Sequence, residues 1–334
     1  MSQVALARAC LFAAALTLAL FPLLAGTFYI QLGAKILIMA VFALSLDLLV
    51  GHTGLVSLGH ATYFGLAAYA LALISPKYAA ANLWLALPPA IAAAALAALL
   101  IGYLVVRTAG VYFIMVTLAF GQMLYAIFHD SKIAGGSDGI YILVRPELTI
   151  AGYKPLDLEN PVQFYYFTLL MLVCVYLFLS RLSRAPFGRA LAGIRANEAR
   201  MRSLGYPVFR YKLGAFVLAG ALAGLAGSLA ACQFGFVNPD ILAWHQSGIV
   251  LMMVILGGMG KLHGAVLGAL AYILLQELLS APGLLGPYAK HWQLAMGGLI
   301  IFVVLILPHG LSGVIDVALR RAYRHTKIDS MNGR

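Results

Sequence analysis

Residues 180–212 read SRLSRAPFGRALAGIRANEARMRSLGYPVFRYK, and this stretch interrupts a series of apolar runs. It carries eight Lys or Arg residues and a single acid, Glu198. So many charges exclude the stretch from a bilayer, and its helix-forming composition is unusual for a simple linker. We interpret it as a cytosolic helix that binds a partner.

The composition of the whole chain indicates a membrane protein. Hydrophobic residues make up 63% of the 334 positions and charged residues only 10%, a balance that would leave a soluble domain with large exposed apolar surfaces. The net charge of +11 would suggest nucleic acid as a partner of a soluble protein. Here the basic residues gather in short loops and at the ends of apolar runs, as the positive-inside rule requires, so we expect no nucleic-acid partner.

Ten apolar runs are candidates for membrane crossings. The first follows Arg8 and resembles a signal peptide, but it has about twenty residues and no clear A-x-A cleavage site, so we expect an uncleaved span. The sequence therefore predicts an all-α polytopic transmembrane bundle of about ten helices. The runs cover residues 9–29, 33–50, 59–75, 83–106, 111–129, 162–182, 213–231, 246–257, 265–279 and 292–307.

The loop charges predict an orientation. Residues 131–160 contain Lys132, Arg145 and Lys154, against eight basic residues in 180–212. The more basic segment is expected in the cytosol. Counting crossings then places both termini in the cytosol. The expected organisation is a transmembrane permease domain over residues 1–316, with a periplasmic loop at 131–160 and a cytosolic coupling loop at 183–212, followed by a basic cytosolic tail at 317–334.

Glycine and polar residues interrupt the apolar stretch DLLVGHTGLVSLGHATYFGLAAYA at residues 47–70. One interpretation is a helix broken at membrane depth, which is tolerated only inside protein or beside a wet cavity. The other is a cytosolic turn followed by close helix packing, since Ser57, Ala61 and Gly65 form a small-xxx-small face. Gly220 and Gly224 predict a second close-packing face at residues 219–231.

Ionisable residues in the apolar runs are few. Asp47, His52, His60 and Glu277 are the main ones, and each is a candidate functional residue because charge is costly in hydrocarbon. They form no obvious relay of carboxylates, so we expect the energy for transport to come from another subunit. The histidines and the three cysteines lack metal-ligand spacing, and no metal site is expected.

No ATPase motif is found in the sequence. In LGGMGKLHG, residues 256–264, a phosphate-binding loop would need Gly at Ile255 and Ser or Thr at Leu262. No G-x-S-x-G setting surrounds a serine either. We therefore expect a transport subunit rather than an enzyme.

Three motifs together resemble a known family. They are G-x-x-G-x-x-S-L-G-H-A-x-x-F-G at 51–65, G-V-Y-F-x-x-x-T-L-A-F-G at 110–121 and G-R-A-L-x-x-I-R-x-N-E-x-x-x-x-x-x-G at 188–205. In combination they resemble the M-type permease of branched-chain amino acid ABC importers. The resemblance implies a bacterial inner-membrane importer with two different permeases, two cytosolic ATPases that bind ATP, and a periplasmic binding protein. It implies no cofactor in this chain.

The resemblance also implies an ATPase-coupling helix at residues 189–205. Apolar residues follow helical spacing there, and Arg195, Glu198 and Arg202 are spaced to pair along one helix. The family's E-A-A-x-x-x-G pattern is not fully kept, because Gly205 falls one residue late. The residues expected to carry coupling are Arg189, Leu191, Ile194, Arg195, Glu198, Met201, Leu204 and Gly205.

Four polar residues in the first two motifs are expected at the solute path: Ser57, His60, Thr117 and Gln122. The alternative is that they tie helices together by hydrogen bonds. The solute also has alternatives, since related permeases carry urea, amides or aromatic acids. A stand-alone channel or secondary transporter is a further alternative, disfavoured by the small number of buried charges.

Overall fold

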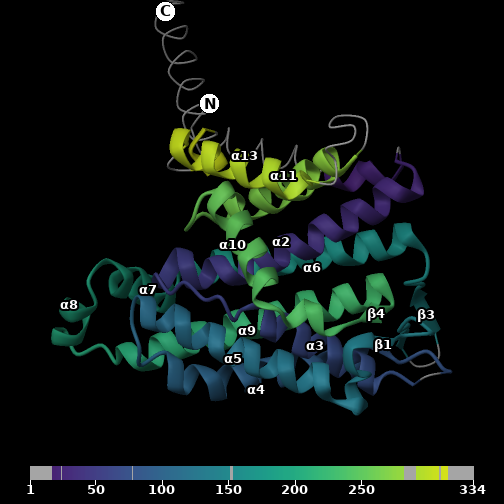
Figure 1. Ribbon diagram of the computed structural model, residues 1–334, viewed down its shortest axis with the longest axis horizontal. Helices are drawn as coiled ribbons and strands as arrows, with labels where there is room; N and C mark the ends of the chain where they lie inside the picture. The colour runs from purple at the N-terminus through teal and green to yellow at the C-terminus, as the bar shows by residue number, and fades with distance from the viewer. Residues whose placement is uncertain are drawn as a thin grey trace, which may run out of the picture.

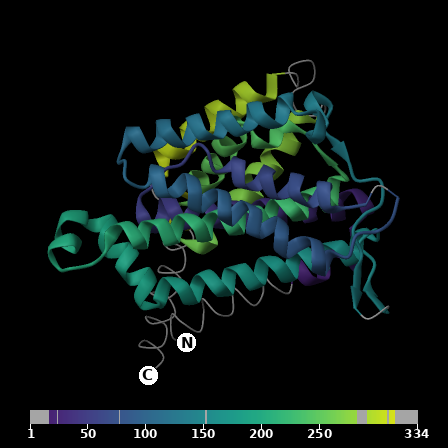
Figure 2. The ribbon, with the colours of Figure 1, turned by 90° about the horizontal axis from the view of Figure 1, so that it is seen from below.

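The computed structural model describes residues 17–23, 25–76, 78–150, 153–281, 291–307 and 310–314. Long helices run side by side along the longest axis of the molecule (Figure 1). The helices α7 and α8 protrude from one end of this bundle, which we name the loop end, and the strands β1 to β4 lie at the opposite end, which we name the hairpin end (Figures 1 and 2).

Two helices of 27 residues form the centre of the bundle, α2 (Thr27–Thr53) and α9 (Val208–Phe234). At 1.5 Å per residue each is about 40 Å long, enough to cross the hydrocarbon core of a bilayer. Both end at a glycine with positive φ, Gly54 and Gly235, as expected for a helix C-terminus. Their apolar side chains are buried all around because other helices surround them.

The outer helices are more exposed, with apolar side chains facing outward where lipid would lie. Asparagine side chains cap two of them, since Asn82 accepts the amide hydrogen of Trp84 and Asn160 that of Val162. The outer helices are α4 (Leu83–Val105), α5 (Val111–Asp130), α6 (Pro161–Arg184), α11 (Leu262–Ser280) and α13 (Trp292–Ile306).

Small residues let α9 approach its neighbours closely. A Cβ atom on Gly227 would lie 1.8 Å from the carbonyl oxygen of Phe64, and one on Gly224 would lie 2.6 Å from the Cβ of Ala94. The packing face predicted at residues 219–231 is therefore confirmed. Close backbone approach of this kind is typical of helix contacts in membranes.

Two apolar helices inside the bundle are short, α3 (Ala61–Ile74) and α10 (Trp244–Gly257). With 14 residues each, they are about 21 Å long and do not reach across a bilayer alone. Non-helical segments precede both. Residues 54–60 lead from α2 into α3, and residues 235–243, with β4 (Phe236–Val237) and η3 (Pro239–Leu242), lead from α9 into α10.

Residues 54–60 are not a simple turn at the surface. The ring of His60 lies beside Ser45, eight residues before the end of α2, with Nε2 2.8 Å from Oγ. The chain thus returns about 12 Å into the bundle before α3 begins. The structure favours the broken-helix interpretation of residues 47–70, although Gly65 also packs closely, against Leu242.

Nine of the ten predicted apolar runs fall on described helices, and of the first run, residues 9–29, residues 9–16 and Leu24 lie outside the described part. Seven helical segments of the described part are long and apolar enough to cross a membrane, among them α2, α4, α5, α6, α9, α11 and the segment that begins with α13. The chain is therefore a multi-pass membrane protein, and its all-α class is confirmed. The count of ten crossings stays a prediction.

Short strands were not predicted from the sequence. At the hairpin end β1 (Ile140–Tyr141) pairs antiparallel with β4, Ile140 opposite Val237, and β2 (Leu148–Ile150) pairs with β3 (Tyr153–Leu156). Two single turns of 3₁₀ helix, η1 (Lys132–Ala134) and η2 (Gly136–Asp138), come before β1. The β1–β4 pair ties the loop after α5 to the segment between α9 and α10.

Candidate functional site

The first candidate site is the junction where residues 54–60 meet α5 and α10. The hydroxyl of Thr117 on α5 accepts the amide hydrogen of Leu58 at 3.3 Å. A Cβ on Gly59 would lie 2.2 Å from the carbonyl oxygen of Thr117, so only glycine allows this approach. Thr117 therefore acts in part as a backbone partner for the non-helical segment.

The second half of the chain supplies another partner. Ser247, in the first turn of α10, accepts the amide hydrogen of Ala61 at 2.8 Å and so caps the start of α3. Ala61 and Ser247 are both buried, so solvent has no access to this bond. The N-termini of the two short helices meet inside the bundle, where each presents a partial positive charge.

The hydrogen bonds around His60 identify which ring nitrogen carries the proton. The Ser45 hydroxyl donates its single hydrogen to the carbonyl of Phe42 at 2.7 Å. It can only accept from His60, so the neutral ring carries its hydrogen on Nε2. Nδ1 is then an acceptor, buried and without a partner.

Four buried polar atoms near this junction lack hydrogen-bond partners among the described residues: Ser57 Oγ, His60 Nδ1, Thr62 Oγ1 and Gln122 Nε2. Ser57 and His60 are fully buried. Unpartnered buried polar groups are rare in proteins because each carries a desolvation cost. Their concentration here marks a place where water or a polar solute can bind.

The structure brings three of the four predicted path residues together. Ser57, His60 and Thr117 belong to one junction, and Gln122 lies farther along α5, next to Gly121, whose Cβ position is 3.1 Å from Thr62 Oγ1. Whether a solute passes them stays a prediction. Ser45 and Ser247 were missed, because single serines in apolar runs form no motif that a sequence search recognises.

The second candidate site is the loop that carries α7 (Pro186–Ala196) and α8 (Glu198–Ser203). The sequence predicted one helix over residues 189–205, but the structure has two, separated at Asn197. The side chain of Asn197 accepts the amide hydrogen of Arg200 and starts α8. A capping residue has an extended rather than a helical backbone, so Asn197 ends α7 as it starts α8.

The predicted apolar face of this loop is divided between two surroundings. Leu191 and Ile194 are buried against this subunit's own helices, with exposed fractions of 0% and 3%. Met201 packs on Gly193, so that Leu204, 65% exposed, remains as the apolar side chain at the tip, beside Gly205. Leu191 and Ile194 are thus not available on the surface, contrary to the expectation of one continuous docking face.

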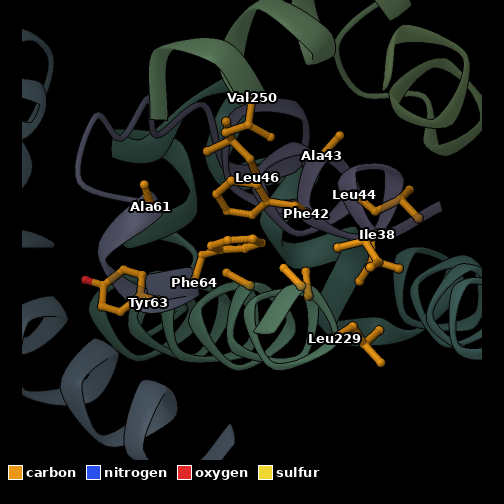
Figure 3. Packing of buried hydrophobic residues seen from close by; sticks show 14 of the residues in the cluster. Ile38, Phe42, Ala43, Leu44, Leu46, Ala61, Tyr63, Phe64, Leu229 and Val250 are labelled. Atoms are coloured by element: carbon orange, nitrogen blue, oxygen red, sulfur yellow. The ribbon is translucent and has the colours of Figure 1, made fainter. Parts of the chain in front are cut away.

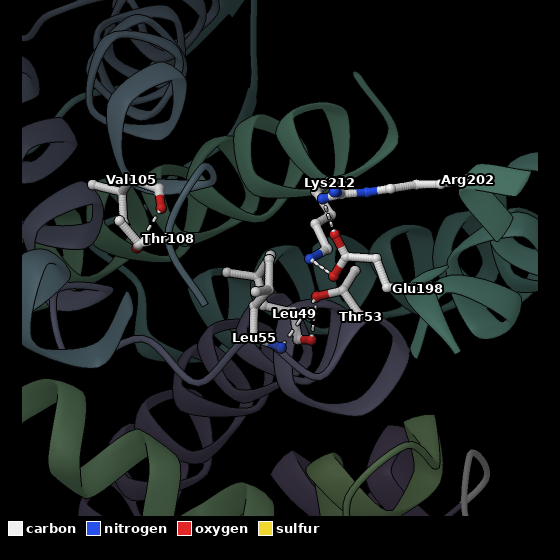
Figure 4. Close-up of polar contacts among 8 residues, drawn as sticks. All are labelled: Leu49, Thr53, Leu55, Val105, Thr108, Glu198, Arg202 and Lys212. Carbon is white, nitrogen blue, oxygen red and sulfur yellow. Dashed lines mark hydrogen bonds and ion pairs between the residues drawn. The ribbon is translucent and has the colours of Figure 1, made fainter. Parts of the chain in front are cut away.

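Charged residues of the loop are fixed by specific contacts (Figure 4). Glu198 pairs with Arg202, as predicted, and with Lys212 at the start of α9, 2.6 Å away. Partial burial raises the pKa of Glu198, but hydrogen bonds and charge from Lys212 and Arg202 outweigh it and hold that pKa below its usual value. The carboxylate therefore stays ionised and anchors α8 to α9.

Arg195 does not pair with Glu198, which corrects the predicted three-residue network. Its Nη1 donates to the carbonyl oxygen of Gly51, at the end of α2. Asp47, one turn earlier, accepts the amide hydrogen of Gly260 at 2.7 Å. Asp47 thus holds the turn between α10 and α11, which is formed by part of the LGGMGKLHG motif. The motif has a structural role in this turn, because Gly260 has a φ of 82°, a backbone conformation that favours glycine.

Comparisons with known proteins are consistent with these features. Residues 28–307 match the family described as the permease component of branched-chain amino acid transport systems. No solved structure gives a significant match to the chain.

Individual relatives include permeases for different solutes. The high-affinity branched-chain amino acid permease LivM of Escherichia coli K12 is 33% identical over 310 residues, 87% of this chain and 71% of that protein. A probable LivM of Methanocaldococcus jannaschii is 28% identical over 163 residues, 44% of this chain and 46% of its own length. The autoinducer 2 permease LsrC of Klebsiella pneumoniae is 34% identical over 151 residues, 44% of this chain and 42% of that protein.

We predict that Ser247→Ala destabilises the protein. The change leaves the buried amide of Ala61 without an acceptor, at a cost of about 1–3 kcal/mol. The measurement is the midpoint of thermal unfolding of the purified protein in detergent. Ser280→Ala, which removes an exposed hydroxyl at the last residue of α11, is the matched control. Ser247→Thr, which keeps an acceptor, is expected to restore stability. Equal midpoints for both alanine variants would contradict the assigned role.

Proposed function

Because the chain belongs to the family of permease components of branched-chain amino acid transport systems, we propose that it forms half of the membrane path of an ATP-driven importer for these amino acids. The match over residues 28–307, which spans nearly the whole bundle, carries the proposal. A second permease forms the other half, two cytosolic ATPases bind and hydrolyse ATP, and a periplasmic binding protein delivers the solute. This subunit holds no cofactor of its own.

The proposed location is the bacterial inner membrane with both termini in the cytosol. The loop end carries eight basic residues in 180–212, whereas the hairpin end carries three in 131–160. The positive-inside rule then supports a cytosolic loop end and a periplasmic hairpin end.

The proposed path includes Ser57, His60, Thr117 and Gln122. The rings of Phe42 and Phe64 lie 4.6 Å apart between their centroids (Figure 3). Phe42 also stacks on the ring of His60, with 5.6 Å between the centroids. Phe42 and Phe64 border a cavity on the hairpin side. A solute that moves from this cavity towards the loop end meets the aromatic pair and then the polar junction.

The proposed docking surface for the ATPase is the tip of the loop around α8. Leu204 and Tyr206 are exposed there, 65% and 42%, beside the exposed Arg200 and Arg202. An apolar centre with a basic rim is typical of a protein interface. Movements of the loop are transmitted to α2 through the bond from Arg195 to Gly51 and to α9 through the pair of Glu198 and Lys212. Leu191 and Ile194 pack on the inner side of the loop.

For the orientation, we predict opposite labelling of two sites in a background without Cys10, Cys174 and Cys232. Ser137→Cys lies on the hairpin end and Ser203→Cys on α8, and both positions are exposed. A membrane-impermeant maleimide added to intact cells is expected to label the first and not the second. Labelling of Ser203→Cys alone would reverse the orientation.

For the coupling surface, we predict that Leu204→Glu weakens attachment of the ATPase. An unpaired carboxylate buried in an interface costs several kcal/mol, so co-purification and solute-stimulated ATP hydrolysis should fall about tenfold or more. The control is Ala109→Glu, an exposed position in the turn between α4 and α5. Normal stoichiometry and normal coupling in Leu204→Glu would contradict a docking role for this tip.

For the function itself, we predict ATP-dependent accumulation of leucine by proteoliposomes that contain both permeases, both ATPases and the binding protein. The measurement is uptake of labelled leucine, with a non-hydrolysable ATP analogue as the control and urea and autoinducer 2 as competing solutes. Uptake without ATP would indicate a channel or secondary transporter. Accumulation of a competing solute but not leucine would identify a permease of the same type with another cargo.

A further inference from the structure

Two adjoining cavities lie near the hairpin end of the bundle, separate from the polar junction at residues 54–60. Their volumes are about 270 Å³ and about 310 Å³, close to the lower bound for small-molecule sites. Both are lined by Lys35, Gln233 and Phe234, so each opens beside the other. The described helices α2 and α9 form their shared wall.

The first cavity is mainly apolar. The side chains of Ile38, Phe42, Phe64, Met253 and Ile273 line it, and all five are buried. They come from α2, α3, α10 and α11, so four elements position them. A cavity with such walls is suited to a small aliphatic or aromatic group.

The second cavity carries the charges. Lys35 projects from α2, Arg145 from the loop before β2, and Glu277 from α11. Among the residues that the structure describes, no ion pair joins Glu277 or Lys35 to another residue. Arg145 donates a hydrogen bond to the carbonyl of Gln233 at 3.2 Å. Charges that line a membrane-protein cavity without pairing are functional candidates.

Gln233 lies between the two cavities and adds an unused acceptor. Its Nε2 donates to the carbonyl of Gln31 at 2.7 Å, which fixes the amide. Its Oε1 is buried and has no partner among the described residues. The boundary between the cavities therefore offers an oriented carbonyl group together with the ammonium of Lys35.

We propose that the two cavities form one binding site for a free aliphatic α-amino acid. The carboxylate binds Lys35 and Arg145, the ammonium binds Glu277 with help from Gln233, and the aliphatic side chain occupies the apolar cavity. This assignment rests on the proposed function for the class of solute. The pattern of charges favours it over a lipid phosphate or a simple anion, because either of those would contact only Lys35 and Arg145 and would leave Glu277 without a partner in the site.

The site has a defined place on the proposed path. Phe42 and Phe64 line its inner wall, and Phe42 also stacks on the ring of His60, which is not part of the lining. Solute held here lies on the hairpin side of the aromatic pair. The site would thus receive an amino acid before it reaches Ser57 and His60.

The test is protection of an engineered cysteine in the purified complex of permeases and ATPases, without the binding protein. Gln246→Cys, which lines the apolar cavity, is placed in the cysteine-free background and treated with methyl methanethiosulfonate. Saturating leucine is expected to slow modification about tenfold. 4-Methylpentanoate, which lacks the ammonium, and 3-methylbutylamine, which lacks the carboxylate, are expected to protect weakly. Ile249→Cys, also in the lining, is the second reporter should the first fail to fold.

The charge assignments have matched variants. Glu277→Gln is expected to remove protection by leucine while leaving the weak effect of 4-methylpentanoate unchanged. Lys35→Met is likewise expected to remove protection by leucine while leaving the weak effect of 3-methylbutylamine unchanged. The control is Asp130→Asn, which changes an exposed acid at the same end of the bundle. In this variant leucine should protect the reporter cysteine as it does in the parent. Unchanged protection by leucine in both cavity variants would overturn the proposal.

Three further outcomes separate this proposal from the proposed function and from lipid binding. Proteoliposomes that accumulate leucine, together with reporters that leucine does not protect, would overturn the binding site alone. Protection that follows the content of phosphatidylglycerol in nanodiscs, rather than leucine, would assign the cavities to lipid and overturn it as well. Protection by leucine without ATP-driven accumulation would support the site and contradict the importer.

Discussion

The rest of this structure depends on the need to satisfy backbone amides inside an apolar bundle. Residues 54–60 enter the bundle without helical hydrogen bonds, and lipid offers no partners for them. Thr117 accepts from Leu58 and Ser247 accepts from Ala61. Because the two hydroxyls come from α5 and α10, the non-helical segment is stable only when both halves of the chain are packed around it.

Hydrogen bonds between side chains and backbone groups also hold the loop end together. Arg195 donates to a carbonyl at the end of α2, and Asp47 accepts from Gly260 in the turn between α10 and α11. Single charged residues therefore hold α2 to two elements that are distant from it in sequence, α7 and this turn. Movement of α7 cannot occur without changing the surroundings of α2, from which residues 54–60 continue.

Polar groups in this bundle are arranged in three levels along its axis. Lys35, Arg145 and Glu277 line a cavity at the hairpin end, Ser57 and His60 lie behind the aromatic pair of Phe42 and Phe64, and Asp47 lies nearest the loop end. The aromatic pair of Phe42 and Phe64 separates the first level from the second. An arrangement of separated polar levels is compatible with stepwise passage of a small solute, in contrast to a continuous aqueous pore.

Composition and local pattern alone determined the class of this protein and its membrane runs, and they predicted the sidedness of its charges, because hydrophobicity and loop charge act through the bilayer and need no tertiary partner. They also marked Ser57, His60 and Glu277 as unusual. Only the tertiary structure decided that Leu191 and Ile194 face inward, that Arg195 contacts Gly51 rather than Glu198, and that Ser45 and Ser247 complete the junction. These outcomes depend on which helices become neighbours, and a serine or a leucine in an apolar run carries no local signal of its partner.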